Sequence, residues 1–457
     1  MTYQVNVVAR STRISRLEQA AATGHTDRVK FQSRWEELPR KVVALDTPIY
    51  RMRNIRTRVK QKAYILDHGE PANFFKDGEE NVSAQRAQHA FLVEMAKAGA
   101  ASGASITRIL EGERVQTEAL LVTDTGVLVN GNRRLAAMRE LFTADPVAYK
   151  DFEHVEVAVL PHDAKEDDLS QIETDLQIAP TGKLDYGWVE EALGLREQFD
   201  ELGWTMDKAR AHWSQTSEEL NRRLDALDLA NRYLESIGKP DRYELVKDDN
   251  LAFQALLRNH RVRQGQAASR LDAEEQLTFA LVNKKALISG RVYSLAGEVD
   301  AILPKVLDDP ALGIPPDSPK PIEPESTDDP LSGLPGEENP ISDAALEYLR
   351  DPDNWGEIAE AAEEAYADIR AGKKQQQRST KFMSDATKVN ALVAGLSLAN
   401  ADPSKMSTAT AQLSAAMRGI SECLRQVLRE HPDTRASLDV HPLEEARHSI
   451  EELLRSE

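Results

Sequence analysis

Four consecutive residues, Gly131-Asn132-Arg133-Arg134, have the types and spacing of a phosphate-binding turn. The apolar run VLV leads into Asn130, and a helix is expected to begin at Arg133. Glycine permits a tight strand-to-helix turn, and the free N–H groups at a helix start attract anions. Arginine is unfavourable there because of the helix dipole, so two adjacent arginines indicate a bound phosphate. The alternative is two solvated surface arginines before an ordinary helix.

The segments around this turn predict a small mixed α/β domain. A helical period marks 83–98, with Ser83 as its expected N-cap and Gly99 as its stop. Two short strands are expected around Asp124-Thr125-Gly126, in a hairpin-like pattern. The remaining expected elements are a strand and loop over 42–66, a helix over Arg133–Phe142, a strand over 155–160 and a helix over 164–176.

The segment EALLVTDTGVLVNGNRRLAAMREL resembles the central motif of the ParB/sulfiredoxin superfamily. That motif is a strand, a turn, a second strand, and then Gly-x-Arg-Arg-x-x-Ala opening a helix. The resemblance covers about residues 40–240 of this chain. It implies that a nucleoside triphosphate binds at Gly131, Asn132, Arg133 and Arg134, because the matching arginines of ParB proteins contact the nucleotide.

Two further segments agree with this resemblance. Asn54-Ile55-Arg56-Thr57-Arg58 falls where the family has an Asn-Pro-Arg loop, although this chain lacks the proline, and it implies nucleotide contacts from Asn54, Arg56, Thr57 and Arg58. Thr174-Asp175-Leu176-Gln177 falls where ParB proteins have Glu-Asn-x-Gln-Arg. Glu173 and Asp175 are therefore candidate catalytic residues and ligands of Mg²⁺, which prefers carboxylate oxygens. The alternative is a solvated helix face.

One residue excludes the redox branch of this superfamily. Sulfiredoxins carry a nucleophilic cysteine between the glycine and the basic pair, where this chain has Asn132. The single cysteine, Cys423, lies far away in the sequence, and sulfinic-acid reduction needs a thiolate. One cysteine also excludes an intramolecular disulfide framework, so a reducing cytoplasmic location is expected.

A helix-turn-helix pattern follows the α/β domain. A helix over Trp204–Trp213, a break at Ser214-Gln215-Thr216 and a second helix with Leu220 and Leu224 have the expected lengths. This segment also resembles its ParB counterpart. The implied DNA contacts, together with a basic patch further along, are Thr216, Ser217, Asn221, Arg222, Arg223, Arg261 and Arg263. Because residues 204–242 carry seven basic and seven acidic side chains, a helical bundle without DNA contacts remains the alternative.

Composition sets the domain organisation. The chain has 457 residues and a net charge of −19, which argues against a binder of polyanions along its whole length. It lacks a continuous apolar run of about 18 residues, so no membrane span is expected. The fold class expected is α+β, with a basic segment over 1–40, the nucleotide-binding domain over 41–182, a helical domain over 183–305, an acidic proline-rich linker over 306–342 and a helical module over 343–457.

Three functions remain open. The first is a ParB-like protein that binds double-stranded DNA as a homodimer and uses CTP or ATP with Mg²⁺ to control that binding or to close a clamp. Any hydrolysis would be slow, because no strong general base is evident. The second is an NTP-dependent kinase or nuclease of a mobile-element or phage-defence system, by fold-level analogy. The third is a non-catalytic adaptor whose pocket is degenerate.

Overall fold

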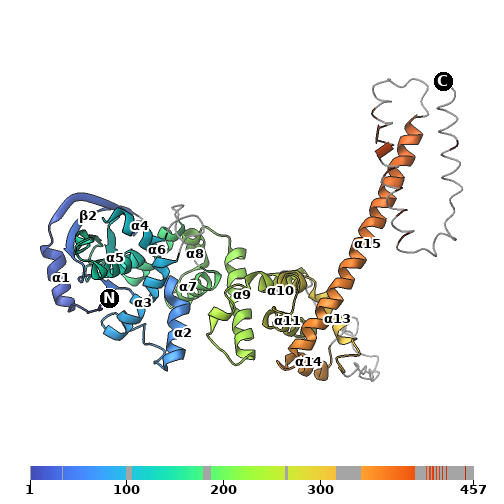
Figure 1. The fold of residues 1–457 in the computed structure, drawn as a ribbon, viewed down its shortest axis with the longest axis horizontal. Helices are drawn as coiled ribbons and strands as arrows, with labels where there is room; N and C mark the ends of the chain where they lie inside the picture. The colour runs from blue at the N-terminus through green and yellow to red at the C-terminus, as the bar shows by residue number, and fades with distance from the viewer. Residues whose placement is uncertain are drawn as a thin grey trace, which may run out of the picture. The chain divides into compact units, whose positions relative to one another are not determined.

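The computed structural model describes residues 2–32, 34–98, 105–178, 187–262, 266–314 and 341–396, with isolated positions between 408 and 448. By backbone contacts, the chain divides into two compact units, Met1–Glu360 and Ala361–Glu457. All predicted site residues belong to the first unit, and many of its helices are labelled in Figure 1. No helix in the described part of the chain is long and apolar enough to cross a bilayer.

The first unit has the α+β class, with a six-stranded mixed sheet followed by helices. The strand order is β1-β2-β6-β4-β5-β3, and both β3·β5 and β4·β6 are parallel pairs. The strands are β1 (Ala22–Phe31), β2 (Arg34–Ala44), β3 (Ile49–Tyr50), β4 (Leu120–Val122), β5 (Val127–Asn130) and β6 (His154–Val159). The predicted hairpin around Asp124 is confirmed, because β4 and β5 pair antiparallel.

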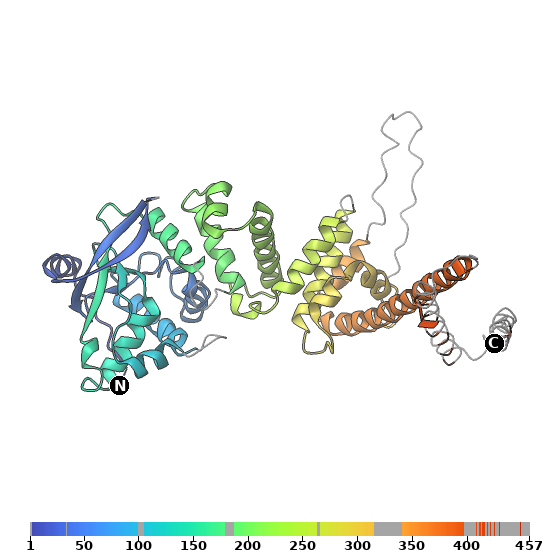
Figure 2. The same ribbon diagram turned by 90° about the horizontal axis from the view of Figure 1, so that it is seen from above.

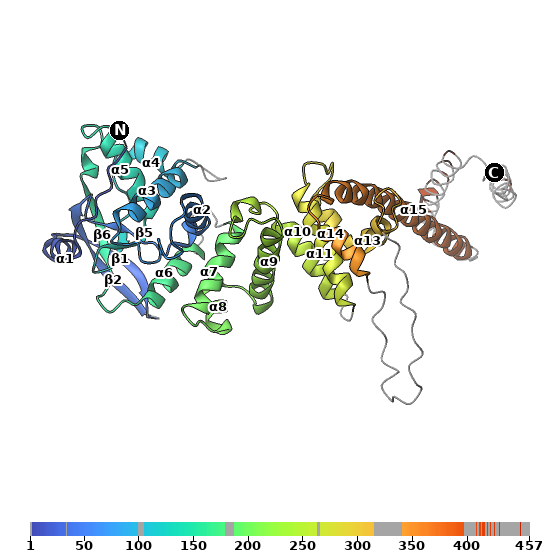
Figure 3. The same ribbon diagram turned by 90° about the horizontal axis from the view of Figure 1, so that it is seen from below.

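Helices cover both faces of this sheet (Figure 3). On one face, α3 (Val82–Lys97) and α5 (Asn132–Ala144) contribute Leu92, Leu135 and Met138 to a core that also holds apolar residues of β3, β4 and β6. On the other face, α6 (Glu166–Ile178) buries Leu169 and Ile172 against the sheet. The helices predicted over 83–98, 133–142 and 164–176 are therefore present, to within two residues at each end.

The N-terminal part departs from the sequence prediction. The sheet begins at Ala22, so the boundary expected at residue 40 cuts through β2. Charged residues interrupt the apolar alternation of both strands, which concealed them. The loop expected up to 66 is instead a 3₁₀ turn, η1 (Ile55–Thr57), and a helix, α2 (Arg58–His68). Two more helices, α1 (Arg10–Gln19) and α4 (Ile106–Glu113), were not predicted.

The predicted N-cap of α3 was wrong. Asn81, rather than Ser83, accepts hydrogen bonds from the N–H groups of Ser83 and Ala84, at 2.8 and 3.3 Å. Asparagine and serine cap helices about equally well, so sequence alone could not choose between them. The expected stop at Gly99 lies outside the described residues.

The rest of the first unit is helical. Its elements are α7 (Trp188–Asp200), α8 (Met206–Trp213), α9 (Ser217–Ser236), η3 (Tyr243–Leu245), α10 (Asn250–Val262), α11 (Ala268–Asn283), α12 (Val292–Ala296), α13 (Val299–Leu307) and α14 (Asp343–Arg350). The helix-turn-helix is confirmed as a shape by α8 and α9. A further helix, η2 (Lys150–Phe152), is a single 3₁₀ turn before β6.

The C-terminal elements are longer than predicted. One helix, α15 (Trp355–Leu396), continues through the gap expected between helices over 342–372 and 384–400. The helices expected after residue 400 lie outside the described residues, apart from isolated positions. Most of the linker expected over 306–342 also lies outside them, although α13 extends to Leu307.

Candidate nucleotide-binding site and helix-turn-helix

The turn before α5 requires glycine. Gly131 has a φ of +95°, and a Cβ atom at this position would lie 2.5 Å from Cδ2 of Leu120. A left-handed φ and a close contact both exclude larger residues. Because β3 and β5 are parallel, the chain leaves both strands at the same edge of the sheet, at Arg51 and at Gly131. The two predicted nucleotide-binding segments therefore share an edge.

Asn132 begins α5 with an unsatisfied acceptor. Its side chain is 7% exposed, and its Oδ1 has no hydrogen-bond partner among the residues that the structure describes. A buried acceptor without a donor costs about 1–3 kcal/mol. Such an atom is expected where a ligand completes the hydrogen bonding. Arg133, next along the helix, is half-buried and has contacts of its own.

Arg134 is held by the segment before β4. It donates a hydrogen bond of 2.8 Å to the backbone carbonyl of Glu118 and pairs with the Glu118 carboxylate at 2.5 Å. Burial lowers the pKa of Arg134, and the Glu118 carboxylate opposes that effect. A nucleotide contact from Arg134 would require this pairing to be exchanged.

The predicted loop over 54–58 is ordered by its own polar groups. Asn54 accepts a hydrogen bond of 3.0 Å from the N–H of Arg56, and its carbonyl accepts one of 3.1 Å from the hydroxyl of Thr57. Thr57 is completely buried, and Arg56 is 9% exposed. Asn54 and Thr57 therefore shape the loop, while arginine side chains supply its charge.

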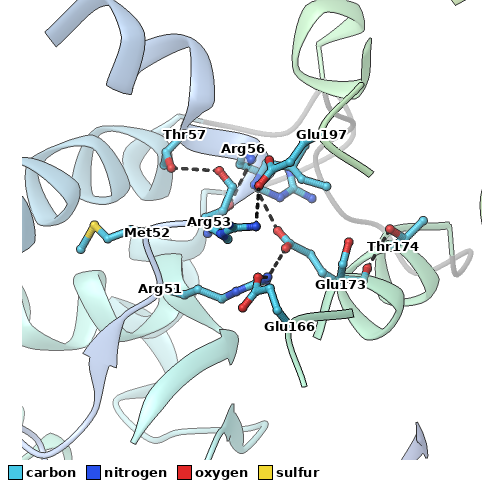
Figure 4. A network of polar contacts seen from close by, with 12 residues as sticks. Arg51, Met52, Arg53, Arg56, Thr57, Glu166, Glu173, Thr174 and Glu197 are labelled. Carbon is cyan, nitrogen blue, oxygen red and sulfur yellow. Dashed lines mark hydrogen bonds and ion pairs between the residues drawn. The ribbon is translucent and has the colours of Figure 1, made fainter. Parts of the chain in front are cut away.

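Arg51 was not predicted, yet it lies at the centre of the polar network in Figure 4. It pairs with Glu173 at 2.7 Å and with Glu166, both on α6. Burial lowers the pKa of Arg51, but the carboxylates of Glu173 and Glu166 raise it by more, so the net shift of the pKa is upward. Burial also raises the pKa of Glu173, which Arg51 opposes, and Glu173 accepts a hydrogen bond from the N–H of Ile55.

Two more arginines of this segment pair with acidic residues at the C-terminal end of α7. Arg53 contacts Glu197 at 3.4 Å and Glu201 at 3.0 Å, and Arg58 also pairs with Glu197. We name Arg51, Arg53, Arg56 and Arg58 the arginine loop. The sequence offered a signal for Arg51 and Arg53, because four arginines fall within eight residues at positions 51, 53, 56 and 58. So many positive charges close together need several negatively charged partners.

Buried glutamines hold the arginine loop in place. Gln88 of α3 donates to the carbonyl of Arg51 at 3.2 Å and to the hydroxyl of Thr57 at 3.0 Å. Gln61 of α2 donates to the carbonyl of Met52 at 2.8 Å. Both side chains are at most 3% exposed. Gln88 lies in the helix predicted over 83–98, whereas Gln61 lies in α2, which was expected to be a loop and so gave no signal.

Glu173 and Asp175 do not form a joint metal site. Residues two apart on a helix point in different directions. Glu173 faces Arg51, whereas Asp175 pairs with His212 of α8 at 2.7 Å. In the described part of the chain, no group of three or more His, Cys, Asp or Glu side chains could hold a metal. The predicted pair of ligands is therefore separated.

The helix-turn-helix has a well-formed turn. Ser214 takes a left-handed φ of +52°, and Thr216 caps α9 in a capping box with Glu219. The side chain of Thr216 is thus used to cap α9. Asn221 lies exposed in the first turns of α9, whereas Ser217 is half-buried. Of these two residues, Asn221 is therefore the more accessible to a partner.

The predicted basic residues of this region have acidic neighbours. Arg222 pairs with Glu218 at 3.4 Å, and Arg261 pairs with Asp225 at 2.7 Å. Arg223 is 18% exposed and pairs with Glu191 at 2.9 Å, so it packs inward against α7 rather than toward a groove. Its guanidinium lies 5.4 Å from the ring centre of Trp213. Arg263 lies outside the described residues.

Helix α8 and the segment just before it make polar contacts with α6, the helix that packs on the sheet. Lys208 and the indole N–H of Trp204 both contact Asp167, at 2.6 Å. His212 contacts Asp175, as described above. The helix that carries Glu173 therefore contacts the arginine loop with one side and the helix-turn-helix with the other.

Comparison with known proteins does not place this chain in a family. No protein-family model matches it, and no curated protein matches it.

Proposed function

We propose that this protein binds double-stranded DNA through its helix-turn-helix, under the control of a nucleoside triphosphate, CTP or ATP. The observation that carries the proposal is the buried, unpartnered Oδ1 of Asn132, directly after the left-handed Gly131. A ribose hydroxyl or a base amino group would donate to it. The N–H groups at the start of α5 and the guanidinium of Arg133 would meet phosphates.

In this proposal, the arginine loop supplies further positive charge for the phosphates, because its arginines can exchange a carboxylate partner for a phosphate. Arg53 and Arg58 pair with carboxylates of α7 that are partly exposed, so phosphate oxygens can replace those carboxylates. Such a replacement would release Glu197 and Glu201 from the loop. Nucleotide binding would then alter the contact between the sheet domain and the helix that precedes the helix-turn-helix.

The described side chains do not by themselves fit a magnesium site. Glu173 already pairs with Arg51, and Asp175 points elsewhere. Mg²⁺ is often held mainly by phosphate oxygens and water, so an ion would enter with the triphosphate. No catalytic step is assigned to Glu173 or Asp175.

A panel of nucleotides tests the first half of the proposal. Isothermal titration calorimetry with CTP, ATP and GTP, each with Mg²⁺, should give binding of at least one. Arg133→Ala and Asn132→Ala should each weaken it at least tenfold, because a charge-assisted or buried hydrogen bond is lost. Arg86→Ala, an exposed residue of α3, is the control and should bind like the wild type. Absence of binding to all three nucleotides contradicts the proposal.

Duplex binding tests the second half. Arg222→Ala combined with Arg261→Ala should weaken binding of a random duplex and reduce the slope of log K against log salt by about 0.9 per lost phosphate contact. Arg210→Ala, on the exposed side of α8, should leave the slope unchanged. An unchanged slope in the double variant would remove α9 and α10 from the DNA surface.

The oligomeric state, proposed as a homodimer, is read from light scattering with and without nucleotide.

One observation favours the adaptor as a second candidate. Arg58 and Arg134 already pair with carboxylates of the same chain, at Glu197 and Glu118. If these pairs are permanent, the pocket is closed and the helical part carries the function. Lack of nucleotide binding together with intact folding would support this candidate. No observation on the described residues favours the kinase or nuclease hypothesis, which stays a prediction.

A further inference from the structure

One tryptophan lies on the surface while the other four are anchored. Trp35 on β2 is 61% exposed. By contrast, the indole N–H groups of Trp188, Trp204, Trp213 and Trp355 each donate a hydrogen bond within the first unit. Exposing a large aromatic ring to water is unfavourable. A binding partner for the ring would account for its position.

Basic residues surround this ring near the tip of the β1–β2 ribbon, the blue hairpin in Figure 2. Lys30 of β1 is the direct cross-strand neighbour of Trp35. The guanidinium of Arg28 lies 5.2 Å from the ring centre, which is a cation–π distance. Arg34 precedes Trp35 and is exposed, but its cross-strand neighbour is Phe31, so it begins on the opposite face of the ribbon. Glu37, the cross-strand neighbour of Arg28, is the acidic residue on the same face.

The opposite face of the ribbon is already packed. Val29, Phe31 and Leu38 are buried together with apolar residues of α6. Near the ribbon tip, the large apolar side chain on the outward face is therefore that of Trp35. Val42, the other exposed large apolar residue of β2, lies at the far end of the strand. One ring would contribute little to binding a membrane surface, because the strength of interfacial binding scales with the apolar area that is buried. Stacking of a nucleic-acid base needs only one face of one ring.

We propose that the outward face of the ribbon tip, which we name the Trp35 face, binds single-stranded nucleic acid. An unpaired base stacks on the indole of Trp35, beside the guanidinium of Arg28. Lys30, the cross-strand neighbour of Trp35, contacts a flanking phosphate. Aromatic rings among basic residues are the usual combination for binding single strands without sequence preference. This site is distinct from the helix-turn-helix and does not depend on the nucleotide site proposed above.

Anisotropy of fluorescein-labelled dT20 and U20, titrated with the full chain at low salt, tests the proposal. Trp35→Ala should weaken binding about tenfold or more, whereas Trp35→Phe should retain most of it, because phenylalanine still stacks. Arg28→Ala with Lys30→Ala should weaken binding and lower its salt dependence. A difference between the two oligonucleotides distinguishes DNA from RNA.

Matched controls separate stacking from general charge. Lys97→Ala with Lys150→Ala removes two exposed positive charges elsewhere and should leave binding unchanged. Thermal melts by circular dichroism should be equal for all variants, because Trp35 is not part of the core. Equal affinity of Trp35→Ala and wild type overturns the proposal, as does tighter binding of a duplex than of dT20 at this face. Trp35-dependent sedimentation with anionic phosphatidylserine vesicles, without oligonucleotide binding, would assign the face to a membrane instead.

Discussion

At the residue scale, the candidate site is dominated by charges that the fold has taken out of water. The side chains of Arg51 and Glu173 are 4% and 8% exposed and lie 2.7 Å apart. Removal of one partner from a buried ion pair leaves the other uncompensated, and this typically costs about 3–5 kcal/mol. The pair therefore fixes the arginine loop to α6.

Arg51→Ala should lower the free energy of unfolding by about 3–5 kcal/mol, because Glu173 would keep its burial and lose its cation. Urea denaturation followed by circular dichroism measures this change. Arg210→Ala is the control, since its pair with Asp207 lies in water and should contribute less than about 1 kcal/mol. Similar values for both variants would mean that Arg51 is not a structural residue.

A second buried group makes the stability depend on pH. His89 contacts the hydroxyl of Tyr50 at 2.7 Å and the carboxylate of Glu140 at 2.9 Å. Burial lowers the pKa of His89, and nearby Arg139 also lowers it, whereas the contact with Glu140 raises it; the net direction is downward. The unfolded chain therefore takes up this proton at a higher pH than the folded chain.

The stability that comes from neutral His89 is thus present above the unfolded pKa of about 6.5 and is lost as the pH falls below it. The free energy of unfolding of the wild type should decrease more between pH 7.5 and pH 5.5 than that of His89→Gln. Urea titrations at the two pH values give both differences. His68→Gln, on an exposed histidine, should behave like the wild type. A pH dependence that His89→Gln leaves unchanged would contradict this assignment.

At the scale of elements, α3 acts as a support for the arginine loop as well as a core helix. Its apolar residues pack on the sheet, while Gln85 and Gln88 donate to backbone carbonyls of Tyr50 and Arg51. These bonds satisfy polar groups that would otherwise be buried without partners. The conformation of the loop is therefore imposed by a helix some thirty residues later in the chain.

Gln88→Leu should lower the free energy of unfolding by about 1–3 kcal/mol, because the carbonyl of Arg51 and the hydroxyl of Thr57 lose their donor. It should also weaken nucleotide binding if the arginine loop contacts phosphates, as proposed. Denaturation and calorimetry on the same preparation measure both effects. Arg86→Leu, on the exposed side of α3, controls for the loss of a polar residue. Loss of stability without loss of binding would separate the loop from the nucleotide site.

At the scale of the whole first unit, α6 connects the sheet domain with the helix-turn-helix. Glu166 and Glu173 contact the arginine loop, while Asp167 and Asp175 contact α8. A change in the arginine loop can therefore reach α8 through one helix. Rigid elements with alternative contacts are the physical means of such coupling.

Asp167→Ala should speed hydrogen exchange in α8 and in the first turns of α6, because Trp204 and Lys208 lose their shared acceptor. Mass spectrometry of deuterated peptides locates the change. Asp207→Ala, 91% exposed on α8, is the matched control and should leave exchange unchanged. Unaltered exchange in Asp167→Ala would show that the two elements are not coupled through this contact.

The sequence by itself determined the elements whose signals are local. The hairpin around Asp124, the glycine turn at Gly131 and the break between α8 and α9 depend on short-range backbone preferences and on helical or strand periodicity. It missed β1 and all but the last residues of β2, where a strand was expected from residue 42, because charged side chains interrupt the alternation of both strands. Which polar residues meet was decided by the tertiary structure alone. The separation of Asp175 from Glu173 already follows from their spacing on the predicted helix. Only packing could place Arg134 against Glu118 and Arg223 against Glu191, because a sequence does not show which distant charges meet.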